Sequence, residues 1–217
     1  MNAGQSSARN VGINAAHGKY IGFMDNDDLL YPDMCKHLYE NAEKYGAVIS
    51  ACSYVIKDEI GNITHNKHIG NIFIYDNKQD IKELLSRVVV DIYFWTKLYR
   101  KDFLDRQGIR FEEGRSEEDR LFNYSAYIVA DRTVMADILV YTYMERKEST
   151  CRTFHQKKFY KYMDDICFRM RTVENGVTNK YPDLAIWAKK KQSMLVLELY
   201  SLLQNIKKKN ASLIIHG

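Results

Sequence analysis

The sequence is poor in the residues that mark several special classes of protein. Its 217 residues include only 2 prolines, 11 glycines and 4 cysteines, against 46% hydrophobic residues. This composition excludes a collagen-like chain, an intrinsically disordered chain and a small domain stapled by disulfides. A chain of this length can instead bury a sizeable core, and we expect one or two domains.

Long apolar runs and a strong charge bias are also missing. No hydrophobic run approaches the roughly 20 residues that a membrane-spanning helix needs, and the first residues show no signal-peptide pattern. The 32 basic and 28 acidic residues are mixed, with a net charge of +4, so we expect no nucleic-acid partner. The cysteines form no C-x-x-C pair, and we therefore expect reduced thiols and a cytoplasmic protein.

The order of apolar runs and helical patterns predicts an α/β fold. Short apolar runs favour strands at residues 19–24, 47–56 and 133–143, and helices are expected to begin near Ser6, Pro32, Asp80 and Ser116. Polar and apolar residues also alternate between Ile63 and Ile74, as in a strand pair. Because strands and helices alternate, we expect a sheet covered by helices on both faces.

The pattern changes near residue 150. Residues 154–173 and 184–206 have the spacing of two long helices, and the second carries a broad leucine-rich face. We therefore expect an α/β domain at residues 1–150 and a C-terminal helical region at residues 151–217.

Three carboxylates follow the first predicted strand, at Asp25, Asp27 and Asp28. In a parallel α/β sheet, ligands bind in the crevice beyond such strand ends. Carboxylates at this density repel one another unless a cation lies among them, and Mg²⁺ or Mn²⁺ can bind one or two of them together with substrate phosphates. A solvated turn that caps the helix at Pro32 explains the same residues about equally well.

Two other acidic motifs fit this turn poorly. An EF-hand loop would need a glycine and a closing glutamate that are missing. A phosphohydrolase with Asp25 as its nucleophile would need a threonine where the sequence has Leu29.

The surrounding residues distinguish these alternatives by their resemblance to a family. They read Asn2-x-Gly4, Ala8-Arg9-Asn10-x-Gly12, Ala16-x-Gly18-x-Tyr20-Ile21, Phe23-x-Asp25-x-Asp27-Asp28 and Pro32. This series resembles the middle of a family 2 glycosyltransferase of the GT-A fold. The resemblance implies that Asp25, Arg9 and Asn2 help to hold the nucleotide-sugar donor, and that Asp27, with Asp25, binds the metal.

A second group of carboxylates surrounds a predicted helix start, from Glu112 to Asp119. An N-cap at Ser116 and the helix dipole account for Glu117, but leave Glu118 and Asp119 open. Sugar transfer with inversion needs a base for the acceptor hydroxyl, and a carboxylate is suitable. The resemblance implies that Asp119 is this base, with Glu118 beside it.

The segment from Trp95 to Arg100 resembles the family's K-L-Y-R segment, which implies that Trp95 and Lys97 lie on the acceptor side. An aromatic ring paired with a cation suits sugars and phosphates. The alternative is ordinary packing, with Trp95 in the core and Lys97 solvated.

The resemblance covers roughly residues 2–150 and begins in the middle of the family's pattern. The family's earlier V-S-V-I-I-P-x-Y-N strand and D-D-G-S strand end, which cradle the nucleobase and ribose, do not occur. We therefore expect a truncated, Rossmann-like GT-A mixed sheet that lacks the N-terminal nucleotide-binding half, with flanking helices. Such a sheet would leave an apolar strand edge open to a partner.

These observations favour a glycosyltransferase over two alternatives. The resemblance implies transfer of a sugar, with inversion and with Mn²⁺ or Mg²⁺, from a nucleotide sugar to a saccharide or lipid-linked acceptor in surface polysaccharide synthesis. The truncated chain could be inactive alone, and the competing hypothesis is a non-catalytic scaffold that oligomerises. A homodimer would form through the C-terminal helices or the open edge, and lysines 189–191 and 207–209 could touch the inner membrane face.

Overall fold

The computed structural model describes residues 4–67, 71–76, 78–86, 90–145, 159–190 and 193. The chain divides into two compact units, Met1–Arg169 and Met170–Gly217. The predicted domain boundary near residue 150 lies outside the described residues, as do the leucine-rich face and the lysines from 207 to 209.

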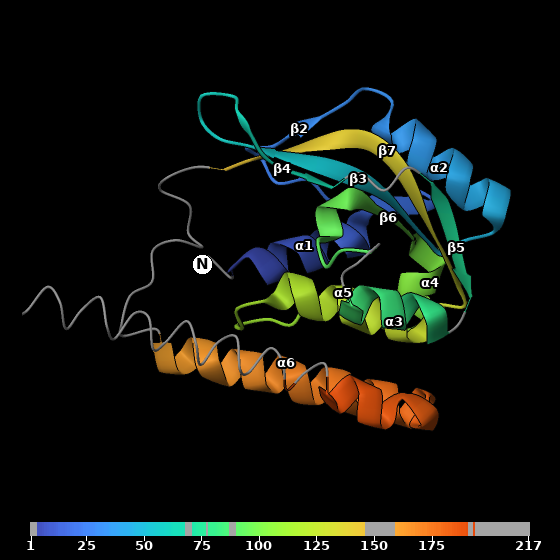
Figure 1. Ribbon diagram of the computed structural model, residues 1–217, viewed down its shortest axis with the longest axis vertical. Helices are drawn as coiled ribbons and strands as arrows, with labels where there is room; N and C mark the ends of the chain where they lie inside the picture. The colour runs from blue at the N-terminus through green and yellow to red at the C-terminus, as the bar shows by residue number, and fades with distance from the viewer. Residues whose placement is uncertain are drawn as a thin grey trace, which may run out of the picture. The chain divides into compact units, whose positions relative to one another are not determined.

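One mixed sheet forms the centre of the first unit (Figure 1). Within the described residues it has seven strands: β1 (Tyr20–Gly22), β2 (Leu29–Leu30), β3 (Ile49–Lys57), β4 (Ile63–Lys67), β5 (Ile72–Asp76), β6 (Lys97–Arg100) and β7 (Arg132–Met144). Their order is β1-β6-β3-β7-β2, with β4 beside β3 and β5 beside β7. β3 and β7 run parallel, and the other described pairs are antiparallel.

Helices lie on both faces of this sheet. The helices of the first unit are α1 (Gly4–Ala15), α2 (Met34–Tyr45), α3 (Lys78–Ser86), α4 (Lys101–Arg106) and α5 (Glu118–Val129), and α6 (Phe159–Lys180) begins in this unit and continues into the second. α2 packs on β3 and β7, while α3 packs on α5 at the opposite face (Figure 1). α2 ends where Gly46 adopts a left-handed conformation with φ 63°, which glycine tolerates without steric cost.

The core explains why the sheet runs through the middle of the unit. The first seven residues of β3 are all buried, and five of them are apolar, as expected for a central strand that is covered on both faces. At the end of β1, the ring of Phe23 makes edge contacts with the rings of Phe94, Tyr99, Phe111 and Phe122, at centroid distances of 5.2 to 6.1 Å. Phe23 therefore anchors the chain directly before the acidic turn.

The predicted fold class is confirmed: a mixed sheet carries flanking helices, and a C-terminal helix follows. Several predicted bounds differ from the structure. The strand expected at residues 19–24 is only Tyr20–Gly22, and the short strand β2 was not predicted. α6 continues beyond the expected end at residue 173 to Lys180, and of the helix expected from residue 184 the structure describes residues 185–190 and 193 as helical.

Two expectations from composition can be compared with the described residues. The thiols of Cys35, Cys52 and Cys167 form no disulfide. In the part of the chain that the structure describes, no helix has the length and hydrophobicity needed to cross a bilayer.

Candidate active site

The acidic turn connects β1 to β2, and its third carboxylate is structural. Asp28 is buried, and its two carboxylate oxygens accept hydrogen bonds from the Tyr141 hydroxyl at 2.5 Å and from the Met144 backbone N–H at 3.0 Å. Burial raises the pKa of Asp28, although these two hydrogen bonds oppose the rise. Asp28 thus fastens the turn to β7, and Asp25 and Asp27 are left as candidate ligands.

Arg9 joins the acidic turn to the start of α5. Its Nη2 lies 3.4 Å from Oδ1 of Asp25, and its Nη1 donates to Oε1 of Glu118 at 2.9 Å. The guanidinium also lies over the ring of Phe94, 4.5 Å from the centroid. Burial raises the pKa of the Asp25 carboxyl, and the positive charge of Arg9 opposes that rise. Two acidic motifs far apart in the sequence therefore meet around one arginine.

The position of Arg9 depends on the neighbouring residue of α1. The side-chain amide of Asn10 bonds to both backbone groups of Phe111: Nδ2 donates to the carbonyl at 2.9 Å, and Oδ1 accepts from the N–H at 2.8 Å. This pairing fixes α1 against the loop that leads to α5. Arg9 thus supplies the positive charge between Asp25 and Glu118, and Asn10 fixes the backbone of Phe111.

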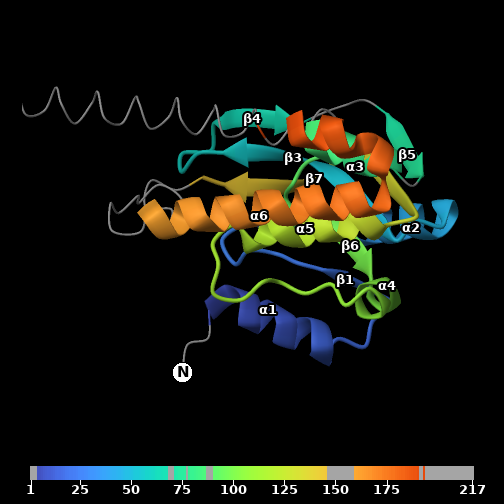
Figure 2. The ribbon, with the colours of Figure 1, turned by 90° about the horizontal axis from the view of Figure 1, so that it is seen from below.

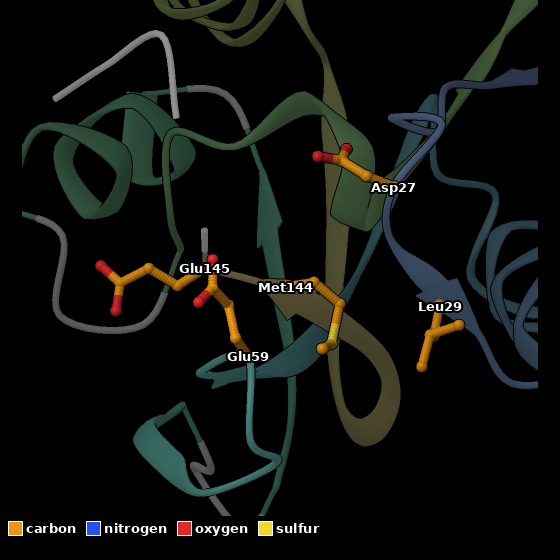
Figure 3. A pocket seen from close by; sticks show the side chains of 5 residues that line it. All are labelled: Asp27, Leu29, Glu59, Met144 and Glu145. Atoms are coloured by element: carbon orange, nitrogen blue, oxygen red, sulfur yellow. The ribbon is translucent and has the colours of Figure 1, made fainter. Parts of the chain in front are cut away.

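Asp27 lines a cavity of about 490 Å³ beside the turn (Figure 3). Its lining combines acidic and apolar side chains from three parts of the sheet: Asp27, Leu29, Glu59, Met144 and Glu145. Among the described residues, no three His, Cys, Asp or Glu side chains form a preassembled metal cluster. The carboxylate oxygens of Asp25 and Asp27 nevertheless suit Mg²⁺ or Mn²⁺, which can take one or two protein carboxylates and leave other positions for phosphates.

Glu118 and Asp119 occupy the first turn of α5. Burial raises the pKa of the Asp119 carboxyl, and the negative charges of Glu118 and Glu117 add to this effect, whereas Arg120 opposes it. A carboxylate with a raised pKa is a stronger base at neutral pH. The raised pKa of Asp119 therefore suits a group that accepts a proton.

Helix α5 begins one residue later than the sequence predicted. The N-cap of α5 is Glu117 and not Ser116, and Glu117 has left-handed backbone angles, φ 61° and ψ 25°. For a residue with a side chain this conformation costs about 1–2 kcal/mol. The Glu117 carboxylate offsets the cost, since it accepts from Arg120 at 2.6 Å and from Arg169 of α6 at 2.7 Å. Arg120 is a local partner three residues along α5, but Arg169 lies 52 residues further along the chain, so the local pattern could not reveal that contact.

Trp95 and Lys97 are both buried. Trp95 lies in the short 3₁₀ helix Phe94–Thr96 and stacks on Tyr141, with ring centroids 4.3 Å apart. Lys97 is only 1% exposed, and its ammonium donates to the backbone carbonyls of Asp91, at 2.8 Å, and Tyr93. Such acceptors offset the cost of burying a charge. Lys97 therefore holds the loop that leads to Trp95, and its charge is directed inward.

Asn123 links this loop to α5. Its Oδ1 accepts from the Tyr99 hydroxyl at 2.6 Å, while Nδ2 donates to the carbonyls of Ile92 at 2.6 Å and Asp119 at 3.2 Å. Neither Asn10 nor Asn123 was a candidate site residue from the sequence, although a polar side chain among the apolar residues of α5 was a usable signal for Asn123.

The predicted site residues therefore fall into three groups. The structure brings Arg9, Asp25 and Glu118 into contact, with Asp119 next along α5. Asp27 lines the neighbouring cavity, and Trp95 and Lys97 are buried. The remaining residue, Asn2, lies outside the described residues.

Comparison with known proteins agrees with this architecture. The pattern of glycosyl transferase family 2 matches residues 1–108. The chain is 33% identical over 151 residues to the uncharacterized glycosyltransferase EpsJ of Bacillus subtilis, which covers 68% of this chain and 44% of EpsJ. It is 28% identical over 183 residues to the glycosyltransferase GlyA of Streptococcus pneumoniae, which covers 80% of this chain and 26% of GlyA. The chain thus spans less than half the length of these relatives.

Among solved structures, S. aureus TarS 1–349 in complex with UDP-GlcNAc superposes with a TM-score of 0.62 at 23% identity, over 82% of this chain and 48% of that one. This likeness shows the fold, which is the GT-A arrangement of a mixed sheet between helices. The chain belongs to glycosyl transferase family 2.

Proposed function

We propose that the chain transfers a sugar from a nucleotide-sugar donor to a glycan or lipid-linked acceptor, with inversion, in the synthesis of a surface polysaccharide. The Arg9 bridge between Asp25 and Glu118 carries the proposal, because it joins the donor-binding turn to the catalytic pair. The solved complex of TarS with UDP-GlcNAc supports a nucleotide-sugar donor.

In the proposed reaction, Asp119 accepts the proton of an acceptor hydroxyl while that oxygen bonds to the anomeric carbon. The bond from the anomeric carbon to the diphosphate oxygen breaks, and its electron pair leaves with the nucleoside diphosphate. Attack opposite the leaving group inverts the configuration. The raised pKa of Asp119 favours this proton transfer.

The other site residues bind and orient the substrates. Asp25, Arg9 and Asn2 hold the donor, and Trp95 with Lys97 shapes the acceptor side. A divalent cation, Mn²⁺ or Mg²⁺, held by Asp27 and Asp25 would neutralise charge on the leaving diphosphate. We further propose that the protein works in the cytoplasm, where it contacts the inner membrane face or a second protomer.

The test measures the binding and turnover of UDP-sugars by the full chain with Mn²⁺, and compares Asp27→Asn and Asp119→Asn. We expect Asp27→Asn to weaken metal-dependent donor binding. Asp119→Asn should leave donor binding intact and lower turnover by about 100-fold or more, the usual contribution of a general base. Metal-dependent binding and turnover that survive both substitutions would refute these assignments, and a stable dimer unaffected by nucleotide would favour the scaffold hypothesis.

A further inference from the structure

Every residue of the 114–117 segment, which leads into α5, contacts the first half of α6 (Lys161–Arg169). The Lys161 ammonium donates to the Gly114 carbonyl at 2.8 Å, and the Ser116 N–H donates to Oδ2 of Asp165 at 2.8 Å. Five further contacts complete the set: Arg115 with Asp164 and with Asp165, the Arg115 guanidinium over the Phe168 ring, and Glu117 with Tyr162 and with Arg169. Figure 2 shows the first half of α6 beside the loop that leads into α5.

Two buried carboxylates are the centres of this contact. The Asp165 side chain is 1% exposed and accepts from Arg115, Lys161 and the Ser116 N–H. The Glu117 side chain is 6% exposed, and its partner Arg169 is 3% exposed. Charged groups removed from water to this extent stabilise a structure only when both partners are present, so losing one partner is strongly unfavourable.

The backbone of Glu117, at the centre of this contact, is strained. Among the described residues, Glu117 is the one non-glycine residue with a positive φ. Such a conformation persists only where the surroundings over-determine it. The partners of Glu117 on α6 lie 45 and 52 residues further along the chain. The local ion pair with Arg120 is therefore joined by a tertiary contact that holds this turn.

We infer that Glu117 is a positioning residue, through which α6 fixes the direction of the first turn of α5 and thereby the placement of Glu118 and Asp119. The inference rests on the proposed function, in which these two residues form the catalytic pair. Glu117 itself touches no reacting atom in this scheme. Its carboxylate holds its own backbone, and that backbone begins the helix that carries the pair.

The first test measures amide hydrogen exchange in the full chain. The reporters are the amides of Leu121 to Tyr124, the first hydrogen-bonded turn of α5, where the Leu121 N–H bonds to the Glu117 carbonyl at 3.1 Å. Glu117→Gly permits the left-handed backbone but removes the carboxylate, and Arg169→Met removes the partner. We expect both to accelerate exchange of these amides by about tenfold, as loss of a charge-assisted hydrogen bond would.

Two further variants are matched controls for this measurement. Arg169→Lys keeps a cation beside Glu117 and should accelerate exchange less than Arg169→Met. Glu112→Gln changes an exposed carboxylate of the same loop and should leave exchange unchanged. If these amides exchange as slowly in Glu117→Gly as in the parent chain, the backbone preference at residue 117 alone sets the turn and the inference is wrong. Equal acceleration in β3 would also overturn it, because global destabilisation would then explain the result.

The second test measures turnover, which a purely structural role would not affect selectively. We expect Glu117→Gly and Arg169→Met to lower kcat about tenfold, with KM for the nucleotide sugar within about twofold. If exchange is locally accelerated in the two variants but the parent chain turns over no nucleotide sugar, the proposed function is refuted and the contact of α6 with α5 remains established. Slow exchange in both variants with normal turnover would refute the positioning role alone.

Discussion

Arg9 Nη1 lies 2.9 Å from Oε1 of Glu118, although the two residues are 109 positions apart. The same guanidinium reaches Asp25, so a single cation is shared by the acidic turn after β1 and the helix start of α5. Both carboxylates are partly withdrawn from water, which strengthens their interaction with the arginine.

Replacing Arg9 should therefore lower the stability of the fold. In Arg9→Met, Asp25 and Glu118 lose their shared cation, and we expect the free energy of unfolding to fall by about 2 kcal/mol. Arg106→Met is the matched control, because Arg106 pairs with Asp102 on the open surface and should change stability by less than about 0.5 kcal/mol. Urea unfolding of the three proteins measures the difference, and equal effects of both substitutions would contradict the bridging role.

Asp28 should behave as a structural residue, unlike its two neighbours in the turn. Asp28→Ala leaves the Tyr141 hydroxyl and the Met144 N–H without their acceptor and should cost about 2–3 kcal/mol of unfolding free energy. Tyr141→Phe should cost about 1 kcal/mol. A double-mutant cycle between the two tests the contact, and strictly additive effects would show that it contributes nothing.

Asp119 should reveal its burial through pH dependence. Its pKa in the folded chain is raised above the unfolded value, so ionised Asp119 destabilises the fold at neutral pH. This penalty shrinks as pH falls from the raised pKa to the unfolded value of about 3.9. Asp119→Asn should therefore raise Tm by about 2 °C or more at pH 7, while turnover is lost. Melting curves at pH 7 and pH 4 check the sign: a larger gain at pH 4 would contradict it.

Asp165 should show the opposite pH dependence. Burial alone would raise its pKa, but Lys161, the Ser116 N–H and Arg115 together hold the pKa below the usual value. Its contribution is present above the unfolded pKa, about 3.9, and is lost as pH falls through the lower folded pKa. We expect Asp165→Asn to flatten the acid limb of the stability curve and to cost about 2 kcal/mol at pH 7. An unaltered acid limb in urea titrations would argue against these contacts.

A substitution of Lys97 tests whether the loop of Trp95 lies on the acceptor side. Lys97→Met keeps the length of the side chain but removes the donor to two backbone carbonyls, which should cost about 2 kcal/mol of stability. If the loop of Trp95 shapes the acceptor side, KM for the acceptor should rise about fivefold or more while donor binding stays unchanged. Weakened donor binding with an unchanged acceptor KM would place Lys97 on the other side of the site.

Much of the architecture follows from local patterns. The apolar run of β3 and the glycine that ends α2 were visible in the amino-acid sequence, because strand burial and helix termination depend on residues within a few positions. The acidic turn after β1 was equally clear. The family resemblance added the pairing of this turn with Glu118 and Asp119, and the contacts of Arg9 bring those two motifs together.

Other features arise only when distant segments meet. From the sequence alone, Lys97 could be a solvated lysine. In the structure its ammonium donates to backbone carbonyls of the preceding loop. Glu117 fits the start of an ordinary helix, yet its backbone is left-handed because Arg169 and Tyr162 reach it from α6. The linear order of residues specifies periodicity, turn chemistry and candidate acids, since these act over one or two turns of chain. The direction in which α5 presents its carboxylates is decided by buried charge pairs across about 50 residues, whose energies exist only once folding removes them from water.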